Sequence, residues 1–215
     1  MLRLFLLLIL VLLSACRSDI TYRVLLVGDS LADFGEPAIR RKLIMSDEAG
    51  FKLDPNPIFG TGFAHADIGR QYWLDRGAAL FANTQYQAVV VSLGINDATA
   101  NADPSKRVSA ADMQTAAARF IALYGAGGRP IFWLLPHTLS PDNYRQEVVA
   151  SIRIVSAPYP QVHFIDLEQI AGARGIAFAD LLLSDGIHLN DQGNTLLADV
   201  VHDMLAADAH ARGLD

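Results

Sequence analysis

The sequence predicts an α/β fold of three layers, in which a central parallel sheet is covered by helices on both faces. Short apolar segments of strand length alternate along the chain with longer segments of helical period, and this alternation is typical of α/β proteins. The strand segments are apolar almost throughout, as in parallel sheets that are buried on both faces. Strands are expected at residues 23–27, 88–93, 131–135 and 162–165, with a further short strand near 52–53.

The longer segments predict five helices, at residues 37–45, 67–81, 110–124, 141–156 and 191–207. Ser109 and Asp112 form an S-x-x-D capping signal at the start of the third helix. Gly125 is expected to end that helix in a left-handed turn. Asn190 or Asp191 is expected to cap the last helix, because Asn and Asp commonly occupy that position.

The composition favours one compact domain. The chain has 215 residues, of which 52% are hydrophobic and 19% charged, so a sizeable buried core is expected and intrinsic disorder is disfavoured. The 17 basic and 23 acidic residues give a net charge of −6, and no run of Lys and Arg occurs. Nucleic acid is therefore not expected as a partner, because proteins that bind it carry a basic surface.

The first 15 residues resemble a bacterial lipoprotein signal peptide. Arg3 precedes an apolar run at 4–13, which is shorter than the ~20 residues that span a bilayer. The sequence Leu13-Ser14-Ala15-Cys16 is similar to a lipobox, in which the chain is cleaved before a cysteine that then carries lipid. Cys16 is the only cysteine, so no internal disulfide can form. An ordinary secretory signal with a cysteine beside its cleavage site is the alternative.

The lipobox resemblance divides the chain into three parts. It implies a signal peptide at 1–15, a lipidated Cys16 with a tether at 16–22, and a folded domain at 23–210. Arg17 follows Cys16, and by similarity to bacterial lipoprotein sorting it favours the outer membrane over the inner one. The sequence thus predicts a protein anchored to a membrane of the bacterial cell envelope and facing the periplasm.

A serine lies in a tight turn directly after the first predicted strand. The turn reads Gly28-Asp29-Ser30-Leu31 and is followed by a predicted helix. In an open parallel sheet this position lies outside the carboxyl end of a strand, where ligands bind in such folds. Ser30 is therefore a candidate nucleophile, although Gly-Asp-Ser alone more often marks an ordinary turn.

Two further polar segments make this candidate stronger. Asp185-Gly186-Ile187-His188 lies just before the last predicted helix, and it could supply an imidazole base and a carboxylate that orients it. Gly94-Ile95-Asn96-Asp97 follows the predicted strand at 88–93, and an amide held there could donate to an oxyanion. Each segment alone is more often a turn or a helix cap. Their co-occurrence with Ser30 supports the catalytic interpretation.

Together these segments resemble the sequence blocks of the SGNH hydrolases, also called GDSL esterases. Gly28-Asp29-Ser30-Leu31 matches the first block, Gly94-x-Asn96-Asp97 the third and Asp185-x-x-His188 the fifth, in the order of the family and over nearly the whole mature chain. The resemblance implies the flavodoxin-like SGNH fold, with Ser30 as nucleophile, His188 as general base and Asp185 as its orienting partner. It implies no metal and no organic cofactor.

The resemblance also implies an oxyanion hole formed by the N–H of Ser30, the side-chain amide of Asn96 and the N–H of a glycine in the second block. Two glycines, Gly60 and Gly62, compete for that last role. Thr61-Gly62-Phe63-x-His65-x-Asp67 is similar to a segment in a periplasmic branch of the family. Gly62 is therefore chosen as the donor, and Gly60 is expected to shape the turn.

Two other site types fit less well. The nucleophile elbow of the ordinary α/β-hydrolase fold reads G-x-S-x-G, whereas residues 28–32 read Gly-Asp-Ser-Leu-Ala. Gly60 and Gly62 begin a G-x-G pattern, but a third glycine and the strand–turn–helix setting of a dinucleotide site are missing.

Three aromatic residues are weaker candidates for the pocket. His137 follows a predicted strand, and it could line the pocket or be structural. Trp73 and Trp133 are expected in the core or in the pocket wall, because nothing in the sequence pairs them at one site as a sugar platform.

The expected function is hydrolysis of acyl esters through a Ser30 acyl-enzyme, with O-acetyl groups of envelope or extracellular carbohydrate as one substrate class. Hydrolysis of longer acyl chains, as by a lysophospholipase or thioesterase, is an alternative. A catalytically silent envelope binding lipoprotein is another, and the intact Ser, Asp and His argue against it. The sequence does not set the natural substrate, the balance of hydrolysis and acyl transfer, or the oligomeric state.

Overall fold

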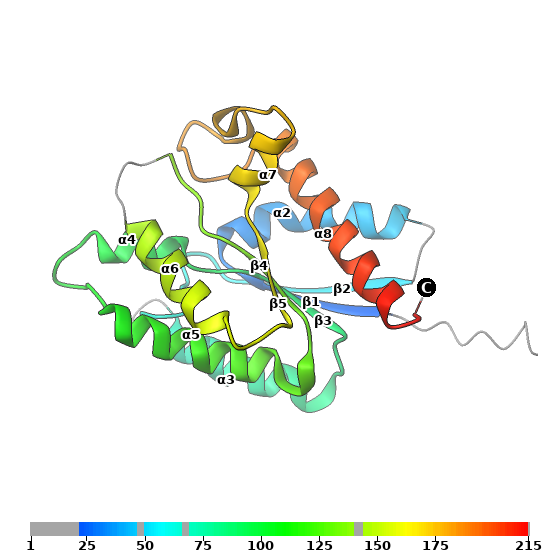
Figure 1. Ribbon diagram of the computed structural model, residues 1–215, viewed down its shortest axis with the longest axis horizontal. Helices are drawn as coiled ribbons and strands as arrows, with labels where there is room; N and C mark the ends of the chain where they lie inside the picture. The colour runs from blue at the N-terminus through cyan, green and yellow to red at the C-terminus, as the bar shows by residue number, and fades with distance from the viewer. Residues whose placement is uncertain (1–21, 47–49, 66–68, 140–143, 215) are drawn as a thin grey trace, which may run out of the picture.

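Five parallel strands form one sheet at the centre of the molecule (Figure 1). The computed structural model describes residues 22–46, 50–65, 69–139 and 144–214. The strand order is β2-β1-β3-β4-β5, and every neighbouring pair is parallel. The strands are β1 (Tyr22–Gly28), β2 (Phe51–Pro57), β3 (Ala88–Ser92), β4 (Ile131–Leu134) and β5 (Val162–Ile165).

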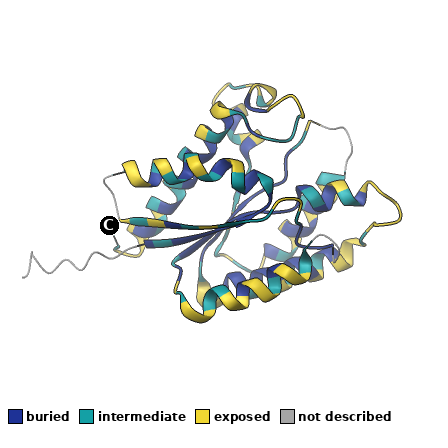
Figure 2. Cartoon of the chain, turned by 180° about the vertical axis from the view of Figure 1, so that it is seen from behind, coloured by how far each residue is buried: buried dark blue, intermediate teal, exposed yellow. Residues whose placement is uncertain are grey.

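Helices cover both faces of this sheet. Alternate residues of β1 enter different cores, because successive side chains of a strand point to opposite faces. Val24 and Leu26 join the core under α2 (Ser30–Met45), α7 (Leu167–Ala173) and α8 (Asp191–Ala211). Leu25 and Val27 join the core under α3 (Arg70–Asn83), α4 (Ile95–Asn101), α5 (Ala110–Tyr124) and α6 (Tyr144–Ser156). Figure 2 shows the buried sheet between helices whose outer faces are exposed. The predicted three-layer α/β fold is confirmed.

The predicted helices agree with the structure except at some ends. α5 has the predicted bounds, and α8 starts as predicted but continues to Ala211. The predicted starts at residues 67 and 141 lie outside the described residues. α2 begins at Ser30, seven residues before the predicted start at residue 37, because the side chain of Asp29 caps it by accepting a hydrogen bond from the N–H of Leu31. Pro37 therefore lies inside the helix.

Two capping predictions are confirmed and one is wrong. Ser109 accepts a hydrogen bond from the N–H of Asp112 at 3.1 Å, and Asn190 caps α8. Gly125 is not left-handed, since its φ is −95° and its N–H still donates to the carbonyl of Ile121, as in a continuing helix. The left-handed residues are Gly127 and Gly128, in the short 3-10 turn that follows. Trp73 and Trp133 are fully buried core residues, as one of the two predictions for them stated.

The sheet brings the ends of β1 and β3 together. Gly28 is paired with Ser92, the last residue of β3. A Cβ atom at position 28 would lie 2.5 Å from the carbonyl oxygen of Ser92, so only glycine fits there. The turns that begin with Asp29 and Leu93 therefore start side by side at the carboxyl edge of the sheet, which is where parallel sheets bind ligands.

Candidate active site

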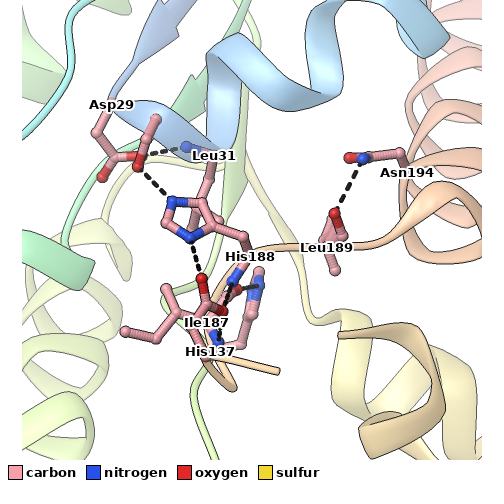
Figure 3. Close-up of polar contacts among 9 residues, drawn as sticks. Asp29, Leu31, His137, Ile187, His188, Leu189 and Asn194 are labelled. Atoms are coloured by element: carbon pink, nitrogen blue, oxygen red, sulfur yellow. Dashed lines mark hydrogen bonds and ion pairs between the residues drawn. The ribbon is translucent and has the colours of Figure 1, made fainter. Parts of the chain in front are cut away.

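Ser30, His188 and Asp185 form one hydrogen-bonded chain (Figure 3). Ser30 is the first residue of α2, and its Oγ lies 2.8 Å from Nε2 of His188, which is 158 residues away in the sequence. Nδ1 of His188 lies 2.7 Å from Oδ2 of Asp185. The structure thus brings together the three residues that the sequence predicted as a catalytic triad.

The hydrogen bonds of Asp185 determine which ring nitrogen of a neutral His188 carries the proton. The bond from the His188 side chain, with those from the N–H groups of Ile187 and His188, holds the pKa of Asp185 at about 2. Both backbone bonds are 2.9 Å long and end on Oδ1, so Oδ2 is available to the imidazole. An ionised carboxylate can only accept, which places the proton of a neutral His188 on Nδ1. Nε2 is then free to accept the Ser30 hydroxyl proton.

The loop after β4 is hydrogen-bonded to the turn formed by residues 185–188. Nε2 of His137 donates to the carbonyl of Ile187 at 3.1 Å, and the N–H of Leu139 donates to the carbonyl of Gly186 at 3.0 Å. Burial lowers the pKa of His137 to about 4, although the carbonyls of Ile187 and Leu135 favour the protonated form. His137 is therefore neutral in the ordinary pH range and carries its proton on Nε2.

His137 lines a cavity of about 270 Å³ between α6 and α7, and neither Ser30 nor His188 lines that cavity. Of the two interpretations left open for His137, the structural one fits its position, since only 2% of its surface is exposed. In Figure 3 it lies beneath the loop that carries His188.

Asn96 connects the turns that follow three neighbouring strands. It lies in the first turn of α4, after β3, and its Nδ2 donates to Oδ2 of Asp29 at 3.1 Å and to the carbonyl of Thr61 at 3.0 Å. Asp29 follows β1, and Thr61 lies in the loop after β2. Both amide hydrogens of Asn96 therefore have acceptors. Donation to an oxyanion requires that one of them be shared or released.

Asp29 is a completely buried carboxyl group beside this amide. Burial raises the pKa of Asp29 to about 7, and the nearby charge of Asp97 adds to the rise. Hydrogen bonds from the N–H of Leu31 and the Asn96 amide oppose it. Asp29 thus caps α2, at whose start Ser30 lies, and also fixes the side chain of Asn96.

Asp97 clamps the loop that contains Gly62. It is fully buried, and its two oxygens accept hydrogen bonds from the N–H groups of Phe63, Ala64 and His65 at 2.9, 2.9 and 3.1 Å. Burial raises the pKa of Asp97, and these three bonds act in the opposite direction. The sequence pattern predicted a role for Asn96 but none for Asp97, since burial of a polar residue cannot be read from the pattern.

The two candidate glycines differ in their surroundings. A Cβ atom at Gly62 would lie 2.5 Å from both carboxylate oxygens of Asp97, so a side chain does not fit there. Gly60 has a φ of +70°, and a Cβ atom there would meet no other heavy atom within 4 Å. The positive φ of Gly60 therefore allows the chain to turn. Gly62 lies directly before the residues whose N–H groups bind Asp97. These surroundings favour Gly62 over Gly60 as a positioned N–H donor.

The clamp predicts a stability loss for Asp97→Asn. An amide keeps one acceptor oxygen but turns an NH₂ group toward a backbone N–H, which leaves a buried donor without an acceptor. We expect the free energy of unfolding to fall by about 1–3 kcal/mol, measured by urea denaturation, together with a lower kcat. Asp103→Asn is the matched control, because Asp103 accepts the N–H of Ser105 on the exposed surface. Equal stability of the two variants would contradict the clamp.

Comparison with known proteins establishes the family and the fold of this chain. A family model described as the GDSL-like lipase/acylhydrolase family matches residues 26–196. No curated protein shows significant sequence similarity to the chain. Many solved structures resemble this chain in fold.

Three of these structures each cover 86% of this chain. An alpha/beta hydrolase from the metagenome of Lake Arreo, Spain, has a TM-score of 0.68 with 14% identity over 94% of its chain. An acetylxylan esterase from Geobacillus stearothermophilus has a TM-score of 0.68 with 15% identity over 94% of its chain. A lipase/acylhydrolase from Enterococcus faecalis has a TM-score of 0.64 with 16% identity over 95% of its chain. The fold is that of the SGNH hydrolases. The chain therefore belongs to the GDSL-like lipase/acylhydrolase family and is a serine hydrolase that acts on ester bonds.

Proposed function

We propose that this protein hydrolyses acyl esters through a Ser30 acyl-enzyme. The observation that carries the proposal is the hydrogen-bonded chain from Ser30 Oγ through His188 to Asp185. Ser30 Oγ attacks the ester carbonyl while its proton passes to Nε2 of His188. Asp185 stabilises the imidazolium that forms, without taking the proton.

The negative charge that develops on the carbonyl oxygen needs donors held in place beforehand. The N–H groups of Ser30 and Gly62 and the amide of Asn96 supply them in this proposal. His188 then gives its proton to the leaving alcohol, which departs and leaves the acyl group on Ser30. In the second half of the reaction water attacks the acyl-enzyme and His188 removes a proton from the water. His188 then returns this proton to Ser30 Oγ as the bond to the acyl group breaks, and the acid is released.

The proposed substrates are short-chain esters, with O-acetyl groups of envelope or extracellular carbohydrate as the first class to test. The Geobacillus structure of the same fold is described as an acetylxylan esterase, which supports this choice as an analogy. A lysophospholipase or thioesterase would instead prefer long acyl chains.

The test is an ester series with one alcohol and acyl chains of increasing length, together with acetylated polysaccharides. Purified protein that starts after Cys16 is expected to cleave acetyl esters with the highest kcat/KM, and Ser30→Ala is expected to be inactive on all of them. A maximum at long chains would favour the lysophospholipase or thioesterase alternative. A folded wild-type protein that cleaves none of them would contradict the proposed hydrolysis.

We also propose a lipid anchor at Cys16 in the bacterial cell envelope, with the outer membrane favoured by Arg17. Both residues lie outside the described residues, so the proposal rests on the lipobox resemblance. Within the part of the chain that the structure describes, no helix combines the length and apolar composition needed to cross a membrane.

Cys16→Ala is expected to release the protein from the membrane fraction or to stop its maturation. Stable attachment needs more than one acyl chain, and all of these chains would depend on this cysteine. The measurement is the distribution of protein between soluble and membrane fractions, with Ser14→Ala as a control that keeps the cysteine. Mature Cys16→Ala protein that sediments with membranes as the wild type does would disprove the anchor.

A further inference from the structure

Two exposed phenylalanine rings stand beside His188. The ring of Phe34 lies edge-to-face with the imidazole of His188, with 5.0 Å between the centroids. The ring of Phe59 lies edge-to-face with Phe34, with 5.9 Å between the centroids. Their exposed fractions are 46% for Phe34 and 59% for Phe59. The pair therefore forms an aromatic surface that begins at the catalytic imidazole and opens to solvent.

The chain places both rings by local structure. Phe34 follows Ser30 by four residues on α2, and residues at this spacing share one face of a helix. Phe59 follows β2 and lies just before Gly60 and Gly62 in the loop that the Asp97 clamp holds. The aromatic pair is thus attached to the same two segments as the nucleophile and one proposed oxyanion donor.

Apolar side chains are also exposed beside the turn that carries His188. Leu139 and Leu183 are 53% and 47% exposed. Their N–H groups bind the carbonyls of Gly186 and His188, so both leucines border the turn that carries the base. Single exposed hydrophobic residues are common, but a group of them around a reactive centre marks a binding surface.

The geometry of the reaction determines which part of a substrate contacts the aromatic pair. The carbonyl oxygen of the ester must lie toward the oxyanion donors, whereas the leaving oxygen must lie within hydrogen-bond reach of Nε2 of His188, which protonates it. A ring in contact with the imidazole therefore borders the alcohol part of the ester. We propose that Phe34 and Phe59 form the subsite for this alcohol part, and that it binds the C–H face of a sugar ring. This proposal rests on the esterase function proposed above.

A sugar ring fits this surface better than a membrane lipid does. A pyranose has a flat, apolar C–H face that packs on an aromatic ring while its hydroxyl groups stay in water, and the open Phe34–Phe59 pair offers such a ring at the solvent boundary. The chain also enters the sheet at Tyr22, the amino end of β1, whereas Ser30 lies beyond the carboxyl end. The seven residues of β1 separate these ends by roughly 23 Å. The chain before Tyr22 therefore joins the domain at the end of β1 that lies opposite the catalytic turn.

The test compares two acetate esters that differ only in their alcohol, acetylated methyl β-xylopyranoside and ethyl acetate. The measured quantity is the ratio of kcat/KM for the sugar ester to that for ethyl acetate. We expect Phe34→Ala and Phe59→Ala each to lower this ratio by about tenfold, because each removes a phenyl group from contact with the sugar. Ile44→Ala is the control, since Ile44 is 70% exposed at the far end of the same helix, and its ratio should equal that of the wild type.

Binding to a protein that cannot react gives a second readout. In the Ser30→Ala background, Phe34→Ala and Phe59→Ala are each expected to weaken binding of the acetylated xyloside by about tenfold in calorimetry. Thermal melts identify any variant that fails to fold, and the other ring then provides the test.

Three results would overturn the subsite. An equal loss on both esters would mean that the rings only support His188. An unchanged ratio would mean that they do not contact the alcohol. A loss that appears only with ethyl octanoate, measured against ethyl acetate, would assign the rings to a long acyl chain. In each of these results the wild type still hydrolyses esters and Ser30 remains reactive, whereas failure of the proposed function would show as a folded wild type without either property.

Discussion

Replacing Ser30 or His188 by alanine is expected to lower kcat for a short acetyl ester by several orders of magnitude, on the order of 10⁴–10⁶-fold. Ser30 Oγ and His188 Nε2 are 2.8 Å apart, so each acts only with the other. The double variant should therefore be little worse than either single variant, because groups that act as one unit do not contribute additively.

Steady-state kinetics of the two single variants and the double variant measure this effect, with a thermal melt for each. Losses that multiply in the double variant would mean that the two residues act independently. A folded His188→Ala protein with wild-type kcat would remove the imidazole from the mechanism.

The hydrogen bonds that join Ser30, His188 and Asp185 predict two further effects on activity. Asp185→Asn should keep more activity than Ser30→Ala, since Asp185 orients the imidazole without touching the ester. Activity of the wild type should fall as the pH is lowered, because a protonated His188 cannot accept the Ser30 proton. Asp185 itself stays ionised at pH values well above 2, since its hydrogen bonds lower its pKa to about 2.

Asn96→Ala is expected to lower kcat by about 10²–10³-fold while the protein stays folded, the usual cost of one lost oxyanion donor. In the free protein the Asn96 amide binds Asp29 and Thr61, so its position is fixed before substrate arrives. The loss should be seen in kcat more than in KM, because the donor strengthens its bond as charge develops in the transition state.

Thr99→Ala is the matched control for Asn96. Thr99 lies on the same short helix, and its hydroxyl donates to the carbonyl of Ile95 within that helix. Kinetics on one acetyl ester should show the large loss in Asn96→Ala and little change in Thr99→Ala. Turnover of a folded Asn96→Ala variant close to that of the wild type would exclude the amide from the oxyanion hole.

The sequence predicted those features that depend on local pattern. Apolar runs located the strands, and polar residues after them located Ser30 and Asn96, because parallel strands end at one edge of the sheet. The predicted start of α2 at Pro37 is too late, because the helix begins where Asp29 caps it and continues through Pro37. The helix α4 was missed because its seven residues are too few to show a helical period.

Other features depend on contacts between distant residues and could not be read from one sequence. The clamp of Asp97 joins residues more than 30 positions apart, and His137 meets Ile187 across 50 positions. The pair Phe34–Phe59 looks like two ordinary core residues in the sequence. Only the fold shows that both rings are exposed and that the ring of Phe34 lies against the imidazole of His188.

The central claim is that Ser30 is the nucleophile, and the most direct test is mass spectrometry of protein treated with a serine-directed phosphonate. We expect one covalent adduct, located on Ser30, together with complete loss of esterase activity. His188→Ala should form the adduct far more slowly, since the hydroxyl then lacks its base. An adduct on another serine, or a folded Ser30→Ala protein that keeps wild-type activity, would show that Ser30 is not the nucleophile.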